Sequence, residues 1–351
     1  MTINVVGYAA RSAEDALVPH RFERREPRPD DVVIDILYCG VCHSDLHQAR
    51  NDWGNSIYPM VPGHEIIGKV ASVGPAVNGF QPGEQVGVGC MVDSCRHCAA
   101  CARGLEQYCE EHSTLTYNDL DRHDHKPTYG GYSTKIVVSD KFVLKIPAGL
   151  DLKGAAPLLC AGITTWSPLR HWNVGADSRV AVIGLGGLGH MTLKLARAMG
   201  ADVSLFTRSV AKEEDARRLG AHRIVLSTDM ALMKAAENQF DLIIDTVPEA
   251  HDLNPYLPTL KLDGTLVLVG YLGPLDPALH TVPLITGRKS VSGSAIGGIA
   301  ETQEMLDFCG EHGITSDIEM IKIKDINNAY ERMLRSDVKY RFVIDMASLK
   351  E

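Results

Sequence analysis

The sequence lacks the features that would place the protein in a membrane, on nucleic acid or in a secretory pathway. No uninterrupted apolar run reaches the roughly 20 residues that a transmembrane helix needs. The segment from Met1 to Tyr8 contains no basic stretch followed by a long apolar one, so no signal peptide is expected. Lys and Arg number 35 against 44 Asp and Glu, and the formal charge of −9 argues against nucleic acid or an anionic membrane as partner. These absences predict a soluble, cytoplasmic protein.

The chain also lacks internal repeats and low-complexity segments, and its hydrophobic pattern changes along its length. Up to residue 152, short β-type runs such as 32–37 and 68–73 are separated by turns containing Gly and Pro, which predicts a mostly β domain. Between 153 and 294, apolar strands such as 179–183 alternate with helical stretches such as 188–199. That alternation predicts a parallel sheet covered on both faces. From 295 on, two helices and a final strand at 340–344 are expected.

The predicted fold class is therefore α/β, a doubly wound parallel sheet of the Rossmann type plus a mostly β domain. The predicted boundaries are 1–152 with 295–351 for the β-rich catalytic domain and 153–294 for the nucleotide-binding domain, because the final strand is expected to return to the first domain. The polar run 121–125 is expected to be a solvated loop rather than a metal site.

Cysteine is abundant for a chain in which disulfides are not expected: there are nine, and seven lie between Cys39 and Cys109. Four thiolates within fifteen residues can surround a tetrahedral zinc ion with no open position, which is typical of a structural site. The alternatives are an iron–sulfur cluster, disfavoured by the spacing and the lack of Pro after the fourth cysteine, and four unrelated thiols. The predicted ligands are Cys95, Cys98, Cys101 and Cys109.

A second metal site is predicted from Cys42, His64 and Cys160. Two cysteines and one histidine form a three-ligand set that leaves zinc a fourth position for water or substrate. These residues are far apart in the sequence, so spacing alone does not establish the site. The segment from Cys39 to Cys42 also fits a Cys-x-x-Cys redox motif, but no thioredoxin-like βαβ pattern surrounds it. Cys39, Cys90 and Cys309 are expected to be core residues.

A glycine-rich turn, Gly184-x-Gly186-x-x-Gly189, follows a predicted strand and opens a predicted helix. Its glycines permit a tight turn, approach of a pyrophosphate and close packing of helix on strand, which indicates a dinucleotide site. The turn residues assigned to this site are Gly184, Gly186, Gly187, Leu188 and Gly189.

The second strand of this unit predicts the choice of dinucleotide. A strand that binds the 2′-hydroxyl of NAD usually ends in Asp or Glu, whereas this strand continues as Thr207-Arg208-Ser209 with Lys212 nearby. Two cations and two hydroxyls without a carboxylate favour the 2′-phosphate of NADP. The alternative is a basic solvated turn.

Taken together, these motifs resemble the zinc-containing medium-chain dehydrogenase/reductase superfamily, and within it the cinnamyl alcohol dehydrogenase group. The resemblance runs essentially from end to end of the chain. It implies a β-rich GroES-like catalytic domain and a Rossmann domain, two zinc ions per chain, NADP(H) as coenzyme, a small alcohol or aldehyde substrate and a homodimer. The segments that carry it are 39–47, 59–65 with Gly68, the four-cysteine segment 95–109, 184–189 and 339–345.

The resemblance also implies roles for individual residues. Cys42, His64 and Cys160 would bind the catalytic zinc, Glu65 would lie beside it, and Asp45 would orient His64. Further assignments are a proton relay of Ser44 and His47 through the nicotinamide ribose, pyrophosphate contacts from His43 and Arg341, and a substrate pocket lined by Trp53, Met91 and Ile296.

The reaction expected from this resemblance is hydride transfer between NADP(H) and a primary alcohol or aldehyde, with aldehyde reduction favoured. A polyol dehydrogenase of the same superfamily is one alternative, but such enzymes typically replace the second cysteine ligand with Glu and bind NAD. A non-catalytic NADPH-binding protein is the other, and the complete ligand set with Ser44 and His47 argues against it.

Overall fold

The computed structural model describes residues 1–270 and 273–350. The chain forms two compact units, residues 1–163 with 297–351 and residues 164–296. Helix α4 (Ala161–His171) contains the first change of unit. The domain boundaries predicted from the sequence, 152/153 and 294/295, lie within eleven residues of these positions.

The first unit is built around a mixed sheet with strand order β16-β17-β3-β4-β5-β9, in which β8 also pairs with β3. Strand β3 is central because it pairs with three neighbours, and Val32 and Ile34 within it are fully buried. Two further strand pairs, β1–β2 and β6–β7, belong to the same unit. The strands are β1 (Ile3–Ala9), β2 (Val18–Arg24), β3 (Asp31–Val41), β4 (Ile66–Val73), β5 (Gln85–Val88), β6 (Met91–Asp93), β7 (Thr114–Leu115), β8 (Lys135–Ser139), β9 (Leu144–Lys145), β16 (Ile318–Lys322) and β17 (Arg341–Asp345).

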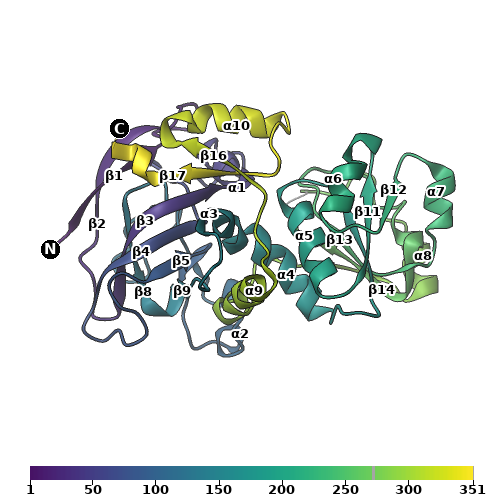
Figure 1. The fold of residues 1–351 in the computed structure, drawn as a ribbon, viewed down its shortest axis with the longest axis horizontal. Helices are drawn as coiled ribbons and strands as arrows, with labels where there is room; N and C mark the ends of the chain where they lie inside the picture. Colours follow the sequence, from purple (N-terminus) through teal and green to yellow (C-terminus); the bar gives the residue numbers. More distant parts are fainter. Residues whose placement is uncertain (271–272, 351) are drawn as a thin grey trace. The chain divides into compact units, whose positions relative to one another are not determined.

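The C-terminal segment completes this first unit. Strand β17 pairs antiparallel with β3, with Ile344 opposite Cys39, and β16 pairs parallel with β17. Figure 1 shows the yellow C-terminal strands beside the purple β3. Residues 341–345 therefore lie against the strand that leads into Cys42. The helices of this unit are α1 (His43–Ala49), α2 (Ala99–Ala102), α3 (Leu152–Ala155), α9 (Ile299–His312) and α10 (Ile326–Leu334).

The second unit is a parallel sheet with strand order β12-β11-β10-β13-β14-β15, which confirms the predicted doubly wound α/β class. Its central strands are mostly apolar and buried because helices cover both faces of the sheet, as Figure 1 shows. The elements are β10 (Arg179–Ile183), α5 (Gly187–Ala198), β11 (Asp202–Thr207), α6 (Glu213–Arg218), β12 (Arg223–Leu226), α7 (Met230–Ala235), β13 (Phe240–Asp245), β14 (Leu260–Leu268), α8 (Thr281–Gly287) and β15 (Ser290–Gly293).

The strand order places the glycine-rich turn at the point where the order of strands in the sheet reverses. The chain runs outward from β10 through β11 to β12, then returns to β13 on the other side of β10. Open α/β sheets bind ligands outside the carboxyl ends of strands at such a reversal of order. The glycine-rich turn follows β10 directly, so it lies at this reversal.

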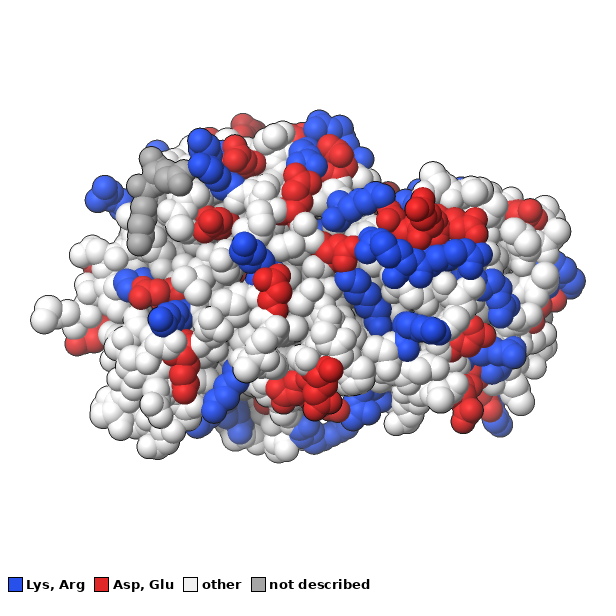
Figure 2. Space-filling model, viewed as in Figure 1, with Lys and Arg blue, Asp and Glu red and all other residues white. Residues whose placement is uncertain are grey.

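Side chains of both charge signs lie on the surface of the protein. On the face drawn in Figure 2, Lys and Arg are interspersed with Asp and Glu. Among the described residues, no helix combines the length and apolar character needed to cross a membrane.

Candidate functional site

Cys42, His64, Glu65 and Cys160 form a buried cluster in the first unit, with ligand atoms that all lie within 4.8 Å of one another. Cys42 joins β3 to α1, and His64 and Glu65 directly precede β4. Cys160 lies between a 3₁₀ turn (Ala156–Leu159) and α4. The Sγ atoms of Cys42 and Cys160 are 3.9 Å apart, although 118 positions separate them in the chain. The fold therefore brings together the residues that the sequence analysis assigned to one metal.

The carboxylate of Asp45 connects the segments that carry two of these residues. Asp45 is fully buried and accepts hydrogen bonds from the backbone N–H groups of Cys42 (2.9 Å) and Gly63 (3.1 Å). The hydroxyl of Tyr132 donates to the same carboxylate at 3.1 Å, and Nδ1 of His64 lies 3.2 Å from it. One side chain thus holds both the loop of Cys42 and the ring of His64.

Glu65 and Arg341 form a buried ion pair at the same cluster. Burial raises the pKa of Glu65 to about 8, against the attraction of Arg341. Oε2 of Glu65 and Nε of Arg341 have no hydrogen-bond partner among the described residues. A buried carboxylate oxygen without a donor is costly, and a bound cation would satisfy it.

The thiol of Cys42 has the electrostatic character of a metal ligand. A hydrogen bond from Cys160 lowers the pKa of Cys42 well below its usual range, and the positive charges of Arg341 and His64 lower it further, against the effect of burial. Metal ligands must be deprotonated, so this environment favours the ligating form. Two thiols, an imidazole and a carboxylate are the donors that zinc binds in proteins, and the cluster therefore fits a zinc ion.

Cys90 corrects the sequence analysis, which assigned it to the core with Cys39 and Cys309. Those two cysteines are fully buried, whereas Cys90 is partly exposed, and its Sγ donates to the carbonyl oxygen of Leu159, next to Cys160, at 3.8 Å. Tyr117 was also missed, although its ring stacks on that of His64 with the centroids 5.7 Å apart. Both contacts join segments that are distant in the sequence, so no local spacing indicated them.

Helix α1 carries Ser44 and His47 three positions apart, and therefore on one face. The Oγ atom of Ser44 is 3.6 Å from the Sγ atom of Cys42, so this hydroxyl borders the metal cluster. The side chain of His47 is 31% exposed, and its Nδ1 is 2.7 Å from Asp52 Oδ2. The pair thus extends from the buried cluster toward solvent. His43, on the same helix, is largely buried, and burial lowers its pKa.

The predicted pocket residues occupy different environments. Trp53 is 39% exposed and its ring centroid is 5.8 Å from that of His47, whereas Met91 is buried. Ile296 belongs to the second unit and has φ of +36°, a left-handed backbone conformation that is unusual for a β-branched residue. Strain of this kind often marks functional positions. The assignment of all three to a substrate pocket stays a prediction.

The four cysteines of segment 95–109 form a second cluster, whose Sγ atoms also lie within 4.8 Å of one another. Backbone N–H groups point at the sulfurs, with Cys98 N 3.3 Å from Cys95 Sγ and Cys101 N 3.5 Å from Cys98 Sγ. The hydrogen bonds that Cys98 accepts from the N–H groups of Cys101 and Glu110 lower its pKa to about 6. Four sulfur donors without another protein ligand fit a closed zinc site. His97 is 70% exposed and pairs with Glu111, as expected for a loop residue.

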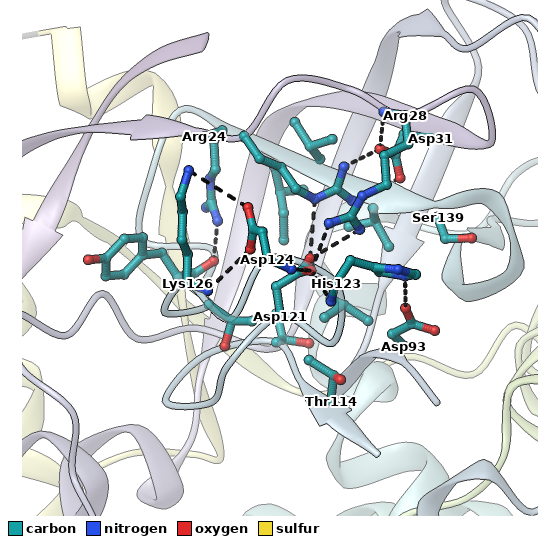
Figure 3. Close-up of a pocket in the computed structure, with 18 of the residues that line it drawn as sticks. Arg24, Arg28, Asp31, Asp93, Thr114, Asp121, His123, Asp124, Lys126 and Ser139 are labelled. Atoms are coloured by element: carbon teal, nitrogen blue, oxygen red, sulfur yellow. Dashed lines mark hydrogen bonds and ion pairs between the residues drawn. The ribbon is translucent and has the colours of Figure 1, made fainter. Parts of the chain in front are cut away.

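A cavity of about 420 Å³ lies beside this lobe, on the first unit (Figure 3). Its charged side chains pair with one another: Arg28 with Asp121 at 2.7 Å, and His123 with Asp93 at 3.3 Å. The run 121–125 forms a turn, as predicted, but Asp121 is only partly exposed. Burial raises its pKa, whereas hydrogen bonds from Arg28, His123 and Asp124, together with the charge of Arg28, outweigh that effect and lower the pKa to about 2. These pairs connect the turn to the segment between β2 and β3 through Arg28 and to β6 through Asp93.

The glycines of the turn after β10 have distinct structural roles. Gly184 has φ of +89°, and a Cβ atom on Gly189 would lie 2.2 Å from the carbonyl oxygen of Gly184. The protein's own packing therefore requires both glycines. A Cβ atom on Gly186, in contrast, would meet nothing within 4 Å. The glycine at that position leaves open space at the N-terminus of α5, where Gly187 and Leu188 begin the helix, and the space fits a dinucleotide pyrophosphate.

The basic turn after β11 lies next to the glycine-rich turn. Lys212 Nζ donates to the carbonyl oxygen of Leu185 at 3.3 Å, and burial together with the nearby Arg208 lowers the pKa of Lys212. The N–H of Ser209 donates to Thr207 Oγ1 at 3.2 Å. The positive charges of Lys212 and Arg208 are therefore close enough to repel each other. An anion bound next to them would stabilise both charges.

Comparison with known proteins gives matches to two families. Residues 28–148 match the alcohol dehydrogenase GroES-like domain, and residues 187–311 match the zinc-binding dehydrogenase family. The aldehyde reductase YahK of Escherichia coli is 54% identical over 352 residues, covering 100% of both chains. The NADP-dependent alcohol dehydrogenase C of Mycobacterium bovis is also 54% identical, over 98% of this chain and 99% of the relative.

Solved structures agree over the whole chain. A cinnamyl alcohol dehydrogenase from Sorghum bicolor has a TM-score of 0.94 at 47% identity and covers 98% of each chain. A cinnamyl alcohol dehydrogenase structure from Helicobacter pylori, complexed with NADP(H), has a TM-score of 0.92 at 45% identity and covers 99% of each chain.

The two cysteine clusters predict different losses on substitution. Elemental analysis of the intact protein should give about two zinc ions per chain, and Cys95→Ser and Cys160→Ser should each lose about one. Cys95→Ser should mainly lower the midpoint of thermal unfolding, because zinc holds a lobe with little apolar core. Cys160→Ser should mainly lower turnover, because that cluster has an open position. One zinc ion in the intact protein, or iron with a visible charge-transfer band, would contradict the assignment.

Proposed function

Since the chain belongs to the family of zinc-binding alcohol dehydrogenases and aldehyde reductases, we propose that it is a zinc-dependent, NADP(H)-linked enzyme that interconverts primary alcohols and aldehydes. The buried cluster of two thiols, an imidazole and a carboxylate carries this proposal. The substrates are aromatic compounds of the cinnamyl or benzyl type and medium-chain aliphatic ones, and aldehyde reduction is the favoured direction. Turnover of a panel of aldehydes with NADPH, scored by kcat/KM, tests it, and no activity with any of them would contradict it.

Cys42, His64 and Cys160 hold the catalytic zinc in this proposal, with Glu65 beside them, and the four cysteines of the lobe hold the structural zinc. When bound, zinc supplies a Lewis acid for the alcohol or carbonyl oxygen, and NADP(H) exchanges the hydride. Asp45 accepts the Nδ1 proton of His64, which leaves Nε2 of that ring as the ligand atom. Burial of the cluster excludes water and strengthens electrostatic interactions within it.

Ser44 and His47 move the proton. The hydroxyl of Ser44 borders the ligand Cys42, so its Oγ is positioned to accept the alcohol proton in oxidation and to return it in reduction. His47 is partly exposed and exchanges that proton with solvent. Asp52 orients the His47 ring through Nδ1.

The coenzyme site consists of the glycine-rich turn and the basic turn. N–H groups at the start of α5 bind the pyrophosphate, with His43 and Arg341 as further contacts, and Gly186 permits its approach. Thr207, Arg208, Ser209 and Lys212 bind the 2′-phosphate.

The alternatives from the sequence analysis receive less support. A polyol dehydrogenase would use Glu as a zinc ligand in place of Cys160, whereas the Cys160 thiol lies in the cluster. A non-catalytic NADPH-binding protein would not need Ser44 beside the metal ligands. A cytoplasmic location stays a prediction, which cell fractionation would test.

A homodimer is the proposed assembly, formed through the edge of the second unit. Within the described residues, β15 has a sheet neighbour only in β14. The adjoining helix α8 exposes Val282 (66%) and Ile285 (76%), apolar side chains that a second copy of this edge would cover. Ile285→Glu should therefore shift the mass measured by light scattering from dimer to monomer, whereas Met230→Glu on α7, an equally exposed apolar position, should leave it unchanged. A monomeric unmodified protein would contradict the proposal.

The proton relay predicts graded losses of alcohol oxidation. Ser44→Ala should lower kcat by roughly 10²–10⁴-fold, the usual range for acid–base groups, because its hydroxyl borders the metal cluster. His47→Ala should lower it less, and added imidazole should restore part of the loss. The control His312→Ala removes an exposed histidine at the end of α9 and should change nothing. If His47→Ala oxidises alcohols at the unmodified rate, the relay role of His47 is wrong.

The basic turn predicts the preference for NADPH. Each charge-assisted hydrogen bond to the 2′-phosphate contributes about 1.5–3 kcal/mol, so losing two of them predicts at least a roughly hundredfold preference over NADH in kcat/KM. The double variant Thr207→Asp with Arg208→Ala should lose activity with NADPH far more than with NADH. Arg217→Ala removes a cation that pairs with Glu213 on α6 and should leave the preference intact. Equal use of both coenzymes by the unmodified protein would show that the turn does not bind the ribose phosphate.

A further inference from the structure

Thr246 lies directly after β13, beside the strand that leads into the glycine-rich turn. It is 7% exposed. Its backbone N–H donates to the carbonyl oxygen of Ile183 at 3.1 Å, and its hydroxyl donates to the same oxygen at 2.8 Å. Thr246 therefore holds the last residue of β10 with two hydrogen bonds.

The same hydroxyl borders the two glycines that the turn requires. Its Oγ1 is 3.4 Å from the carbonyl oxygen of Gly184. A Cβ atom on Gly184 would lie 3.2 Å from this Oγ1, and so would a Cβ atom on Gly189. The Thr246 side chain thus occupies the corner formed by the end of β10 and the first turn of α5.

We propose that Thr246 is a positioning residue for coenzyme binding, which holds the glycine-rich turn in the shape that receives the pyrophosphate. The inference rests on the proposed function, since it concerns NADPH at that turn. Gly184 has a positive φ, and a glycine can adopt several other backbone conformations as well. The residue itself therefore does not determine which conformation the turn adopts. The hydroxyl of Thr246 favours the observed conformation of the turn, because it bonds to the Ile183 carbonyl at the end of β10 while Gly184 and Gly189 pack against it.

The role of the hydroxyl is separable from the fold of the unit. In Thr246→Val the shape of the side chain is kept and the hydroxyl is lost, but the Ile183 carbonyl still accepts from the backbone N–H of residue 246. The Gly184 carbonyl loses its long hydrogen bond from the hydroxyl, but Gly184 is only partly buried, so the variant should fold. Thr246→Ser keeps the hydroxyl and loses only a methyl group.

The test compares NADPH affinity among these variants by titrating nicotinamide fluorescence in the zinc-loaded enzyme. Thr246→Val should raise the Kd and the KM for NADPH about tenfold, a change typical of one lost hydrogen bond, while kcat at saturating NADPH stays within about twofold. Thr246→Ser should bind within about twofold of the unmodified protein. Zinc content should be the same in all three.

The matched control is Thr259, whose buried hydroxyl donates to the carbonyl of Tyr256 at 2.7 Å in the same unit. Thr259→Val should lower thermal stability without changing the Kd for NADPH. The inference is overturned if Thr246→Val binds NADPH normally, if Thr246→Ser is as weak as Thr246→Val, or if Thr259→Val weakens binding equally. Failure of the unmodified protein to bind NADPH would instead overturn the proposed function, and this inference with it.

Discussion

The buried carboxylate of Asp45 is the interaction on which the proposed catalytic centre depends. It accepts hydrogen bonds from the backbone of Cys42 and Gly63 and lies against Nδ1 of His64, so it joins the end of β3 to the segment before β4. A fully buried carboxylate is stable only with such donors, and Tyr132 supplies a further one. The same contacts orient the metal ligands, so the requirement to satisfy one buried charge also determines the geometry of the site.

The C-terminal strand β17 also contributes to the metal cluster, through the side chain of Arg341. Arg341 begins β17, which pairs with β3, and its guanidinium lies against Glu65 beside Cys42. The positive charge of Arg341 lowers the pKa of the Cys42 thiol and opposes the rise in the pKa of Glu65 caused by burial. Arg341, which is 276 positions from Glu65 in the sequence, therefore contributes to the electrostatics of the cluster.

In the second unit, the coenzyme site arises from a contrast between open space and packing. Side chains at positions 184 and 189 would collide with neighbouring atoms of the protein, whereas Gly186 faces open space. Lys212 reaches back to the carbonyl of Leu185, which brings the basic turn after β11 to the edge of that space. In the proposed function, backbone geometry at the glycine-rich turn therefore binds the pyrophosphate, and positive charge at the basic turn binds the 2′-phosphate.

The sequence by itself indicated the four-cysteine cluster and the dinucleotide turn, because these depend on residue type and short spacing: four cysteines within fifteen residues, and glycines between a strand and a helix. The residues of the other cluster, Cys42, His64 and Cys160, are far apart in the sequence, so only their residue types suggested that they share a metal. It also predicted the α/β class, because periodicity is local: strand β10 has the predicted bounds, and helix α5 begins and ends one residue before the predicted ones. Only the tertiary structure decided the rest. The contacts of Cys90 with Leu159, of Tyr132 with Asp45 and of Thr246 with Gly184 join segments separated by 62 or more positions. Such contacts arise from strand pairing and burial of the whole chain, and those interactions leave no periodic signal in the segments that make them.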